Sequence, residues 1–409
     1  MRYQYQYACG PKRVAGFAKG GVEMPQWTTW DWPFFGQAHA ELSSRLSSWT
    51  LPGVDHEASD LEPACRTIAR SLGAAGLIRT ALPLPQADGA VRIDVRSLCL
   101  AREAVAYQSA LADSVLAMQG IGSAAIWMHG TPALQRRYLE PIRNGEAIAA
   151  FALTEPATGS DVANIATRAE KSGDSYILNG EKTYISNAPF ADHYIVVART
   201  GEAPGAKGLT AFIVEAGTPG LAAGDPIELM APHPVAPLRF ENCRIPATSM
   251  LGLPGKGFGV AMSTFDVFRT SVGAAAVGMG RRALDEVLDR VRTRNLFGAA
   301  MSELQGVQSK LADMAMDIET AALTVYRAAW AKDTTGGRCS REASMAKFVG
   351  TEFASRVIDN AVQIFGGMGV TRGSMVEQLY REIRASRIYE GASEVQKIVI
   401  ARDLLANRS

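Results

Sequence analysis

The alternation of hydrophobic and polar positions divides the chain into three regions. From about 38 to 145 the pattern is helical, and in 98–118 apolar residues recur at three- and four-residue spacing with few β-branched side chains. From about 147 to 251, short β-rich stretches alternate with turn residues. From about 257 onward, helical spacing returns over longer stretches. This α–β–α order has no repeated strand–helix units, so it excludes a TIM barrel and a Rossmann fold.

The middle region predicts a small sheet. The stretches 175–178, 194–198 and 209–214 have the composition of β-strands. Asn179-Gly180 follows the first of them, and Asn-Gly between two β-rich runs is the strongest short-range signal for a hairpin turn. We therefore expect a hairpin at this dipeptide and an antiparallel domain of the sandwich or barrel type.

The third region predicts long helices at 265–294, 305–332 and 341–365, whose Ala- and Met-rich faces lie opposite polar faces. Such faces are typical of a helical bundle. The predicted fold class is therefore multidomain α+β. We expect a helical domain at 1–146, an antiparallel β-domain at 147–254 and a helical bundle at 255–409.

The opening segment is irregular and aromatic, with Trp27, Trp30, Trp32, Phe34 and Phe35. We expect it to lie as a strap over the helical core, and a lid over a ligand is the alternative. The first 22 residues contain four basic residues and no acid, which resembles a transit peptide. They have no serine and no amphipathic stripe, so the cytoplasm is the expected compartment.

Composition and charge narrow the function classes. A chain of 409 residues can bury a large core divided among two or three domains. The formal net charge of +1 and the pI of 7.6 provide no global field that favours nucleic acid or an anionic membrane. No apolar run approaches membrane-spanning length. The cysteines are odd in number and lack CxxC spacing, so they predict buried thiols in a reducing compartment: Cys9, Cys65, Cys99, Cys243 and Cys339.

Two motif matches have simple structural explanations. Residues 278–283 fit the dinucleotide pattern GxGxxA, yet they lie inside a helical stretch instead of after a strand, so close helix packing is the favoured interpretation. Ser344 and Lys347 have the SxxK spacing of a serine nucleophile with a lysine base, but a shared helical face explains that spacing. The five histidines show no pair at metal-ligand spacing, so we expect no catalytic metal.

Three loop segments are richer in chemistry. Residues 154–161, T-E-P-A-T-G-S-D, can present amides and hydroxyls to a polar ring edge or a phosphate, or form an ordinary polar turn. Residues 363–370, Q-I-F-G-G-M-G-V, end a helix with glycines that permit close approach of a ligand, and a helix C-cap explains one of them. In 294–298, R-N-L-F-G, Arg294 could hold a phosphate or compensate the helix macrodipole.

Near the C-terminus, 388–391 reads I-Y-E-G and places Glu390 between a tyrosine and a glycine. Burial in an apolar pocket disfavours the charged form of a carboxylate, raises its pKa and makes it a ready proton acceptor. Gly391 leaves room for a ligand beside the acid. An ordinary surface carboxylate is the alternative.

Together these segments resemble the acyl-CoA dehydrogenase family. The resemblance extends over about 123–405, with the motifs in the family's order. They are TEPATGSD (154–161), NGEKTYISN (179–187), FDVFR (265–269), RNLFG (294–298), QIFGGMGV (363–370) and RIYEGASEVQ (387–396). The resemblance implies an N-terminal helical domain, a middle β-domain and a C-terminal four-helix bundle. It also implies FAD bound without a Rossmann motif, a homotetramer built from dimers, and an electron-transfer flavoprotein as electron acceptor.

The resemblance assigns the chemistry to Glu390. This residue matches the family's base, which removes the α proton of a saturated acyl-CoA while the β hydrogen leaves as hydride to flavin N5, giving the 2-enoyl-CoA. The Glu390 backbone N–H and a flavin ribityl hydroxyl would bind the thioester oxygen as an oxyanion hole. Some branches of the family take the base from a position that is Phe268 here. Phenylalanine cannot accept a proton, which leaves Glu390.

The resemblance also assigns binding residues position by position. Against the flavin it places Phe151, Leu153, Thr154, Tyr184 and Ser186, the last two where the family usually has Trp and Thr. Toward the FAD of a neighbouring subunit it places Arg294, Phe297 and Gln305. At the adenine and pyrophosphate it places Gln363 and Gly367, and further cofactor positions are Ala392 and Glu394. The CoA and acyl site would include Ser160, Asp266, Arg269 and Gly391.

The chain departs from the family pattern in ways that bear on the substrate. Ala392 stands where the family commonly has threonine, and one lost neutral hydrogen bond to FAD costs about 0.5–1.5 kcal/mol. The sequence L-P-L-P-Q at 82–86 replaces the usual Y-G-G loop beside the acyl pocket. Arg387 could favour a polar or acidic acyl group, or lie at the surface. Alternative functions on the same fold are an acyl-CoA oxidase, a lyase-type flavoenzyme, and a CoA-ester binding protein without turnover.

Overall fold

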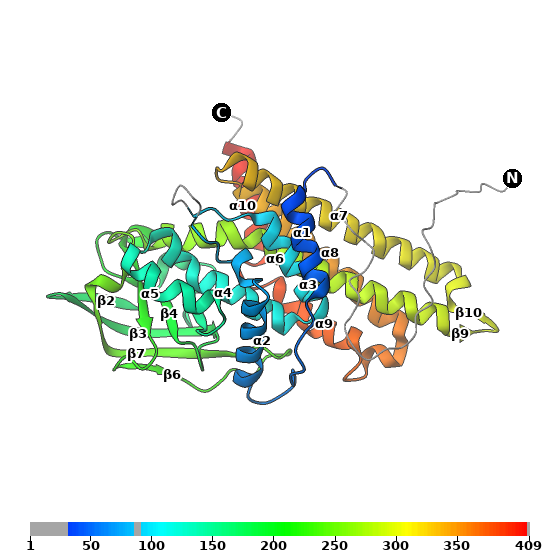
Figure 1. Ribbon diagram of the computed structural model, residues 1–409, viewed down its shortest axis with the longest axis horizontal. Helices are drawn as coiled ribbons and strands as arrows, with labels where there is room; N and C mark the ends of the chain where they lie inside the picture. The colour runs from blue at the N-terminus through cyan, green and yellow to red at the C-terminus, as the bar shows by residue number, and fades with distance from the viewer. Residues whose placement is uncertain (1–31, 86–90, 407–409) are drawn as a thin grey trace.

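The computed structural model describes residues 32–85 and 91–406, and it contains an N-terminal helical region, a middle sheet and a C-terminal helical region (Figure 1). The predicted multidomain α+β class is confirmed. The aromatic strap is described only from Trp32 onward, so Trp27, Trp30 and the basic leader lie outside the described residues.

The N-terminal region is built of helices. They are α1 (Gln37–Ser48), α2 (Glu62–Ala74), η2 (Ile78–Thr80), α3 (Val95–Gln108), α4 (Ala110–His129) and α5 (Pro132–Arg143). The apolar run at 98–118 is divided between α3 and α4, because Ser109 is extended (φ −163°) and caps α4. Its Oγ accepts a hydrogen bond from the Ala112 N–H at 3.2 Å.

The middle region forms one sheet. Its strands are β1 (Ala149–Ala152), β2 (Arg168–Ser172), β3 (Ser175–Ser186), β4 (His193–Arg199), β5 (Leu209–Glu215), β6 (Leu221–Ala223), β7 (Val235–Pro246) and β8 (Met250–Leu251). Their order is β6-β7-β3-β2-β4-β5-β8, and β1 pairs with β4. The pairings are antiparallel except those of β4 with β1 and β2, which are parallel.

The predicted hairpin at Asn179-Gly180 is wrong. Both residues lie inside β3, where the pairing with β7 shifts register between Leu178 and Gly180. Gly180 has φ 144°, so the dipeptide supplies the backbone freedom of a bulge instead of a turn. The two-residue hairpin turn is Gly173-Asp174, between β2 and β3, and Gly173 has φ 61°.

The three long helices predicted for the C-terminal region are present, and α6 begins at Gly257 instead of 265. The elements are α6 (Gly257–Thr293), β9 (Asn295–Leu296), β10 (Ala299–Ala300), α7 (Gln305–Thr335), α8 (Ser340–Phe365), η7 (Gly366–Val370), α9 (Met375–Ser386) and α10 (Ser393–Ala406). The GxGxxA match lies within α6 and packs helices, as expected. A Cβ on Gly278 would lie 2.1 Å from the Glu103 carbonyl oxygen on α3, so only glycine permits this approach.

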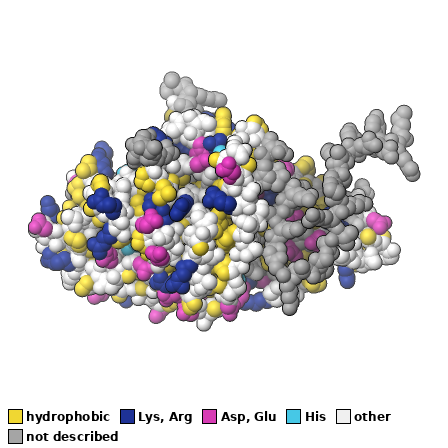
Figure 2. All heavy atoms as spheres, in the orientation of Figure 1, with side chains coloured by type: hydrophobic (Ala, Val, Ile, Leu, Met, Phe, Trp, Pro, Cys, Tyr) yellow, Lys and Arg dark blue, Asp and Glu magenta, His cyan; other side chains and the backbone are white. Residues whose placement is uncertain are grey.

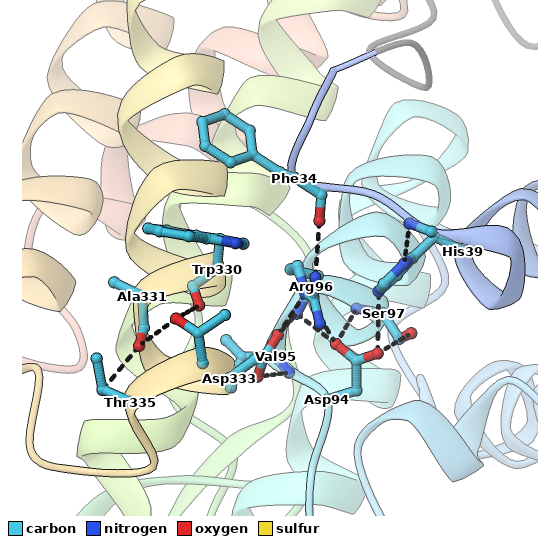
Figure 3. Close-up of polar contacts among 12 residues, drawn as sticks. Phe34, His39, Asp94, Val95, Arg96, Ser97, Trp330, Ala331, Asp333 and Thr335 are labelled. Carbon is cyan, nitrogen blue, oxygen red and sulfur yellow. Dashed lines mark hydrogen bonds and ion pairs between the residues drawn. The ribbon is translucent and has the colours of Figure 1, made fainter.

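A polar cluster attaches the start of α3 and the N-terminal strap to the end of α7 (Figure 3). Asp333 on α7 accepts hydrogen bonds from the Val95 N–H at 2.8 Å and from Arg96 Nε at 2.8 Å. Arg96 Nη1 also donates to the Phe34 carbonyl oxygen at 2.7 Å. Burial and the neighbouring Asp94 together raise the pKa of Asp333 to about 6. The strap is therefore held to the bundle by polar contacts as well as by its aromatic rings.

The molecular surface carries both signs of charge. On the face shown in Figure 2, basic and acidic side chains are interspersed, in keeping with the net charge of +1. Among the described residues, no helix is both long enough and apolar enough to cross a membrane. Cys65, Cys99 and Cys243 are buried free thiols, and Cys339 is a partly exposed one.

Candidate active site

Glu390 lies in the turn between α9 and α10 with a left-handed backbone, φ 52°. Positive φ is uncommon for a residue with a side chain, and it persists only where the surroundings hold it. Gly391 follows at φ 90°. A Cβ there would lie 2.5 Å from Gln396 Nε2, so glycine is needed for both its conformation and its size.

Two buried side chains, one on α8 and one on α10, donate hydrogen bonds to this turn. Lys347 Nζ on α8 and Gln396 Nε2 on α10 each donate a hydrogen bond to the Gly391 carbonyl oxygen at 2.7 Å. Lys347 and Gln396 are both fully buried. The sequence analysis missed both residues, and only the SxxK match drew attention to Lys347.

The carboxylate of Glu390 has an unsatisfied oxygen. Oε2 is buried and has no hydrogen-bond partner among the described residues. Burial raises the pKa of Glu390 above its ordinary value, although the positive charges of Arg102, Lys347 and Arg269 oppose that rise. A buried carboxylate with a raised pKa and a vacant acceptor atom is suited to take a proton from a bound molecule.

A buried ion pair lies next to this site, and the sequence analysis did not identify it. Arg102 on α3 donates to both carboxylate oxygens of Asp113 on α4, at 2.9 and 2.7 Å, and to Ser271 Oγ on α6 at 3.0 Å. Both partners are almost completely buried. The signal available in the sequence was an arginine inside the apolar run 98–118. The bidentate pair joins α3 to α4, and the hydrogen bond to Ser271 joins α3 to α6.

Phe268 stands where the resemblance expects the base in some branches of the family. Its ring is fully buried, and a Cβ on Gly120 would lie 2.3 Å from its Cε1 atom. The ring is therefore packed against α4 and supplies no proton acceptor at this position.

The predicted substrate residues lie on α6 and in the turns. Arg269 is buried, its Nη1 lies 3.6 Å from Asp266 Oδ1, and its Nε has no hydrogen-bond partner among the described residues. Its charge acts on Glu390, so it lies near that carboxylate. Asp266 also accepts from Ser340 Oγ at 3.3 Å. Ser160 is exposed in its loop and open to a ligand.

The predicted flavin residues of the sheet come together at the joined ends of β1 and β3. The Thr183 N–H donates to the Thr154 carbonyl oxygen at 2.9 Å, which joins the two segments. Phe151 packs edge-on against Phe265 of α6, with ring centroids 5.6 Å apart. Leu153 is buried beside it. These residues form an apolar wall with hydroxyl groups at its edge.

Tyr184 and Ser186 lie on the same strand, β3, and differ in environment. Tyr184 is 60% exposed and has φ 54°, so its large ring is held toward solvent in a strained backbone. Ser186 Oγ lies 2.8 Å from His233 Nε2, and His233 Nδ1 lies 2.9 Å from Ser114 Oγ on α4. Burial lowers the pKa of His233 to about 4, so a neutral imidazole links the two hydroxyls. The sequence analysis missed His233.

The other predicted cofactor residues lie far from the sheet. Arg294, Phe297, Gln305, Gln363 and Gly367 are all exposed, near the ends of α6 and α8 and the start of α7. In Figure 1 the β9–β10 hairpin, which carries Phe297 at its tip, lies at the opposite end of the molecule from the sheet. One chain therefore does not bring the two groups together. They fit one FAD only if a second copy contributes the distal group.

The start of α10 completes the surroundings of the base. Glu394 and Ala392 are accessible there. Arg387 Nη2 forms an ion pair with Glu352 Oε2 at 2.7 Å, and Ser393 Oγ donates to Glu352 Oε1 at 2.6 Å. Arg387 is thus engaged with α8, which supports its structural role over a role in recognising an acyl group.

An open cavity of about 510 Å³ lies at the N-terminus of α6. Two lysines, Lys207 and Lys256, line it together with His129, Phe258 and a glycine-rich segment. Backbone N–H groups at a helix N-terminus and two cations favour an anion. The sequence signal that could have revealed this cavity was the run G-L-P-G-K-G-F-G at 252–259.

Comparisons with known proteins agree along the chain. Three family models match in order: Acyl-CoA dehydrogenase, N-terminal domain at 51–146, middle domain at 150–243, and C-terminal domain at 255–405. The chain is 38% identical over 327 residues to a 3-(aryl)acrylate reductase of Clostridium sporogenes, covering 79% of this chain and 86% of the relative. It is 37% identical over 355 residues to the mitochondrial short-chain specific acyl-CoA dehydrogenase of Homo sapiens, covering 86% and 84%.

Solved structures show the same similarity. Butyryl-CoA dehydrogenase from Megasphaera elsdenii matches with a TM-score of 0.76 at 35% identity, over 86% of this chain and 100% of that chain. A structure described as an electron transferring flavoprotein of Acidaminococcus fermentans matches with a TM-score of 0.83 at 34% identity, over 92% and 99%.

Proposed function

Because the chain belongs to the acyl-CoA dehydrogenase family of FAD-dependent oxidoreductases, we propose that it converts a saturated acyl-CoA thioester to the 2-enoyl-CoA with Glu390 as base. The observation that carries this proposal is the buried Oε2 of Glu390, to which no residue in 32–85 or 91–406 donates a hydrogen bond. Most buried polar groups in folded proteins are hydrogen-bonded, so a buried carboxylate oxygen without a protein partner is available to a ligand.

Glu390 takes the α proton onto its carboxylate while the β hydrogen departs with its electron pair. FAD, when bound, supplies the acceptor for that hydride. The residues that fit the cofactor are the apolar wall and hydroxyl edge made by Phe151, Leu153, Thr154 and Ser186, with the exposed Tyr184 beside them. The raised pKa of Glu390 matters because general-base catalysis is most effective when the pKa of the base approaches the working pH.

The remainder of the thioester would extend along α6. Arg269 of α6 acts electrostatically on Glu390, Asp266 lies one turn before it, and the open cavity lies at the N-terminus of the same helix. Lys207, Lys256 and the first N–H groups of α6 suit the phosphates of the CoA nucleotide. These assignments are supported by charge and by position along one helix.

The same site supports proposals for two partners, a second copy of this chain and an electron acceptor. The distal residues Arg294, Phe297 and Gln305 complete an FAD site only across a subunit boundary, which supports a homo-oligomer, with a dimer of dimers as the form that we propose. An electron-transfer flavoprotein is the acceptor that we propose. A structural neighbour described as such a flavoprotein supports this choice.

The test is the Glu390→Gln variant in its FAD-loaded form. It should keep a full complement of FAD, while the rate of acyl-CoA-dependent bleaching of the flavin absorbance falls by about 10²–10⁴-fold. The matched control is Glu170→Gln, on the exposed side of β2, which should bleach as the wild type does. Full bleaching in Glu390→Gln would reject the assigned base.

The same preparation separates the alternative functions. An acyl-CoA oxidase would consume oxygen stoichiometrically with substrate. A lyase-type enzyme would form product without any electron acceptor. A binding protein without turnover would show a ligand-induced spectral shift and no bleaching. An anaerobic titration with acyl-CoAs of different length and polarity would identify the preferred acyl group.

The reverse reaction is a second candidate, because one relative is named a 3-(aryl)acrylate reductase. The same Glu390 would then return a proton to the α carbon of an unsaturated acyl group. Incubation of the reduced enzyme with an aryl-acrylate ester of CoA tests this direction. Reoxidation of the flavin only in the presence of that ester would support it.

A further inference from the structure

The SxxK match contains a lysine that the helical-face explanation does not account for. Lys347 lies on α8 and is fully buried, although lysine is rarely buried without an ionic partner. We infer that Lys347 is a positioning residue for the proposed base: it anchors the peptide beside Glu390 and holds a positive charge near the carboxylate without pairing with it. This inference rests on the proposed function.

The contacts of Lys347 fix the backbone and leave the side chain of Glu390 unpaired. Nζ donates to the Gly391 carbonyl oxygen at 2.7 Å, and no ion pair joins Lys347 to Glu390 among the described residues. Gln396 Nε2 donates to the same oxygen at 2.7 Å. Two donors on one carbonyl hold the peptide between Gly391 and Ala392, one residue after Glu390, and this supports the uncommon φ of 52° at Glu390.

The separation between the two charges has a chemical consequence. A lysine bonded directly to a buried carboxylate stabilises the charged form and lowers its basicity. By bonding to the neighbouring carbonyl instead, Lys347 leaves Oε2 of Glu390 free to accept a proton. Its charge still opposes the rise in the pKa of Glu390 that burial causes.

The same contacts argue against a serine nucleophile at this motif. Ser344 Oγ is buried and has no hydrogen-bond partner among the described residues, whereas Lys347 Nζ is engaged with Gly391. A lysine acting as base for a serine must lie within hydrogen-bond reach of its hydroxyl. Lys347 therefore acts on the base turn.

Several other charged groups face the pair, so a pH effect has to be assigned by variants. The groups that act on Glu390 are Arg102 of α3, Asp113 of α4, Arg269 of α6 and Lys347 of α8. Those that act on Lys347 are Glu390, Arg269, Glu352 of α8 and Glu394 of α10. Only a change at Lys347 removes a positive charge and the anchor together.

The experiment compares Lys347→Met with Gln396→Leu in the FAD-loaded protein. Both variants remove one donor from the Gly391 carbonyl, and only the first removes a charge. We expect each to lower kcat by about 10- to 100-fold with little change in KM, because a small misplacement of a catalytic group costs about that factor. Only Lys347→Met should move the acid limb of the kcat/KM profile to higher pH, since loss of a nearby positive charge raises the pKa of Glu390.

A readout that does not depend on turnover accompanies the kinetics. Infrared difference spectra of Lys347→Met against Lys347→Met/Glu390→Gln, titrated with pH, follow the protonated carboxyl band of Glu390. The pH midpoint of this band should be higher for Lys347→Met than for the wild type measured against Glu390→Gln. Lys347→Arg retains the charge and should restore the wild-type midpoint.

The outcomes separate this inference from the proposed function. Loss of bleaching in Glu390→Gln together with an unshifted midpoint and acid limb in Lys347→Met overturns the role of Lys347 alone. Full bleaching in Glu390→Gln overturns the proposed function itself. Lys182→Met is the control for removing a buried lysine elsewhere, and a shift of the acid limb in that variant would also count against the inference.

Discussion

Two fully buried lysines, one in the sheet and one in the helical bundle, differ in how they contact the segment that carries a nearby glutamate. Lys182 of β3 donates directly to Glu155 Oε1 at 2.7 Å, whereas Lys347 of α8 donates to the carbonyl that follows Glu390. Burial lowers the pKa of each lysine to about 8. Burial therefore affects the two lysines similarly, but only Lys182 donates a hydrogen bond directly to a carboxylate.

Glu155 is completely satisfied. Besides Lys182, it accepts hydrogen bonds from the Ala166 N–H at 2.5 Å and the Thr167 N–H at 2.9 Å. Although burial opposes its ionisation, the charge of Lys182 and these amides hold the pKa of Glu155 below its ordinary value. Glu390 has a raised pKa and, within the part of the chain that the structure describes, an oxygen with no hydrogen-bond partner. The comparison teaches that the motif TEPATGSD carries a paired structural acid, whereas the acid of the motif IYEG is available for the reaction that we propose.

The largest expected effect is on stability, from Lys182→Met. This change leaves Glu155 buried without its counter-charge, and breaking a buried pair by removing one partner costs about 3–5 kcal/mol. Denaturant unfolding of the FAD-saturated protein measures the loss. The double variant Glu155→Gln/Lys182→Met should lose less than the sum of the two single variants, and additive losses would contradict a direct pair.

A smaller loss is expected from Lys347→Met. Its partner is a neutral carbonyl that keeps its bond from Gln396, so the cost is that of one charge-assisted hydrogen bond, about 1–3 kcal/mol. The same unfolding measurement applies. A destabilisation equal to that of Lys182→Met would indicate that Lys347 is bound to a carboxylate in solution and would remove the contrast between the two sites.

The two glutamates should also titrate with opposite effects on stability. A carboxyl with a raised pKa destabilises the folded state once the pH exceeds its unfolded pKa, whereas one with a lowered pKa stabilises it there. At pH 7 Glu390→Gln should therefore raise the free energy of unfolding by roughly 0.5–2 kcal/mol, as removal of functional strain commonly does. Glu155→Gln should lower it.

The difference for Glu390→Gln should shrink as the pH falls toward the ordinary carboxyl range, because the wild-type Glu390 becomes protonated there. The difference for Glu155→Gln should persist to lower pH, because the pKa of Glu155 in the folded protein lies below that range. Unfolding curves for the wild type and the two variants at several pH values between 7 and 4 test this. Differences of the same sign for the two variants would contradict the distinction between the sites.

The smallest effect is expected at Ala392, next to the base turn. Ala392→Thr restores the hydroxyl that the family commonly places against FAD, and one neutral hydrogen bond contributes about 0.5–1.5 kcal/mol. The affinity for FAD should rise by roughly 2- to 10-fold, as measured by fluorescence titration of the apoprotein. Unchanged affinity would show that the turn presents position 392 away from the cofactor.

Much of the candidate site could be predicted from residues close together in sequence. Glu390 and Gly391 stand in one tetrapeptide whose chemistry is visible without a structure, and the glycines of 278–283 were recognised as a packing feature from their place in a helix. The Asn-Gly dipeptide shows the limit of such signals. The dipeptide indicates a backbone with positive φ, which occurs both in hairpin turns and in bulges. The pairing of β3 with β7 places it at a bulge.

The sequence by itself determined the order of helical and β-rich regions, the candidate base and the motifs of the family, because periodicity, glycine placement and short motifs are local properties. The tertiary structure alone decided what surrounds the base. Lys347 and Gly391 are 44 residues apart, and Arg102 and Ser271 are 169 apart. These pairs meet only through the packing of helices. Whether a buried charge is paired or left unpaired depends on which groups that packing brings within hydrogen-bond distance.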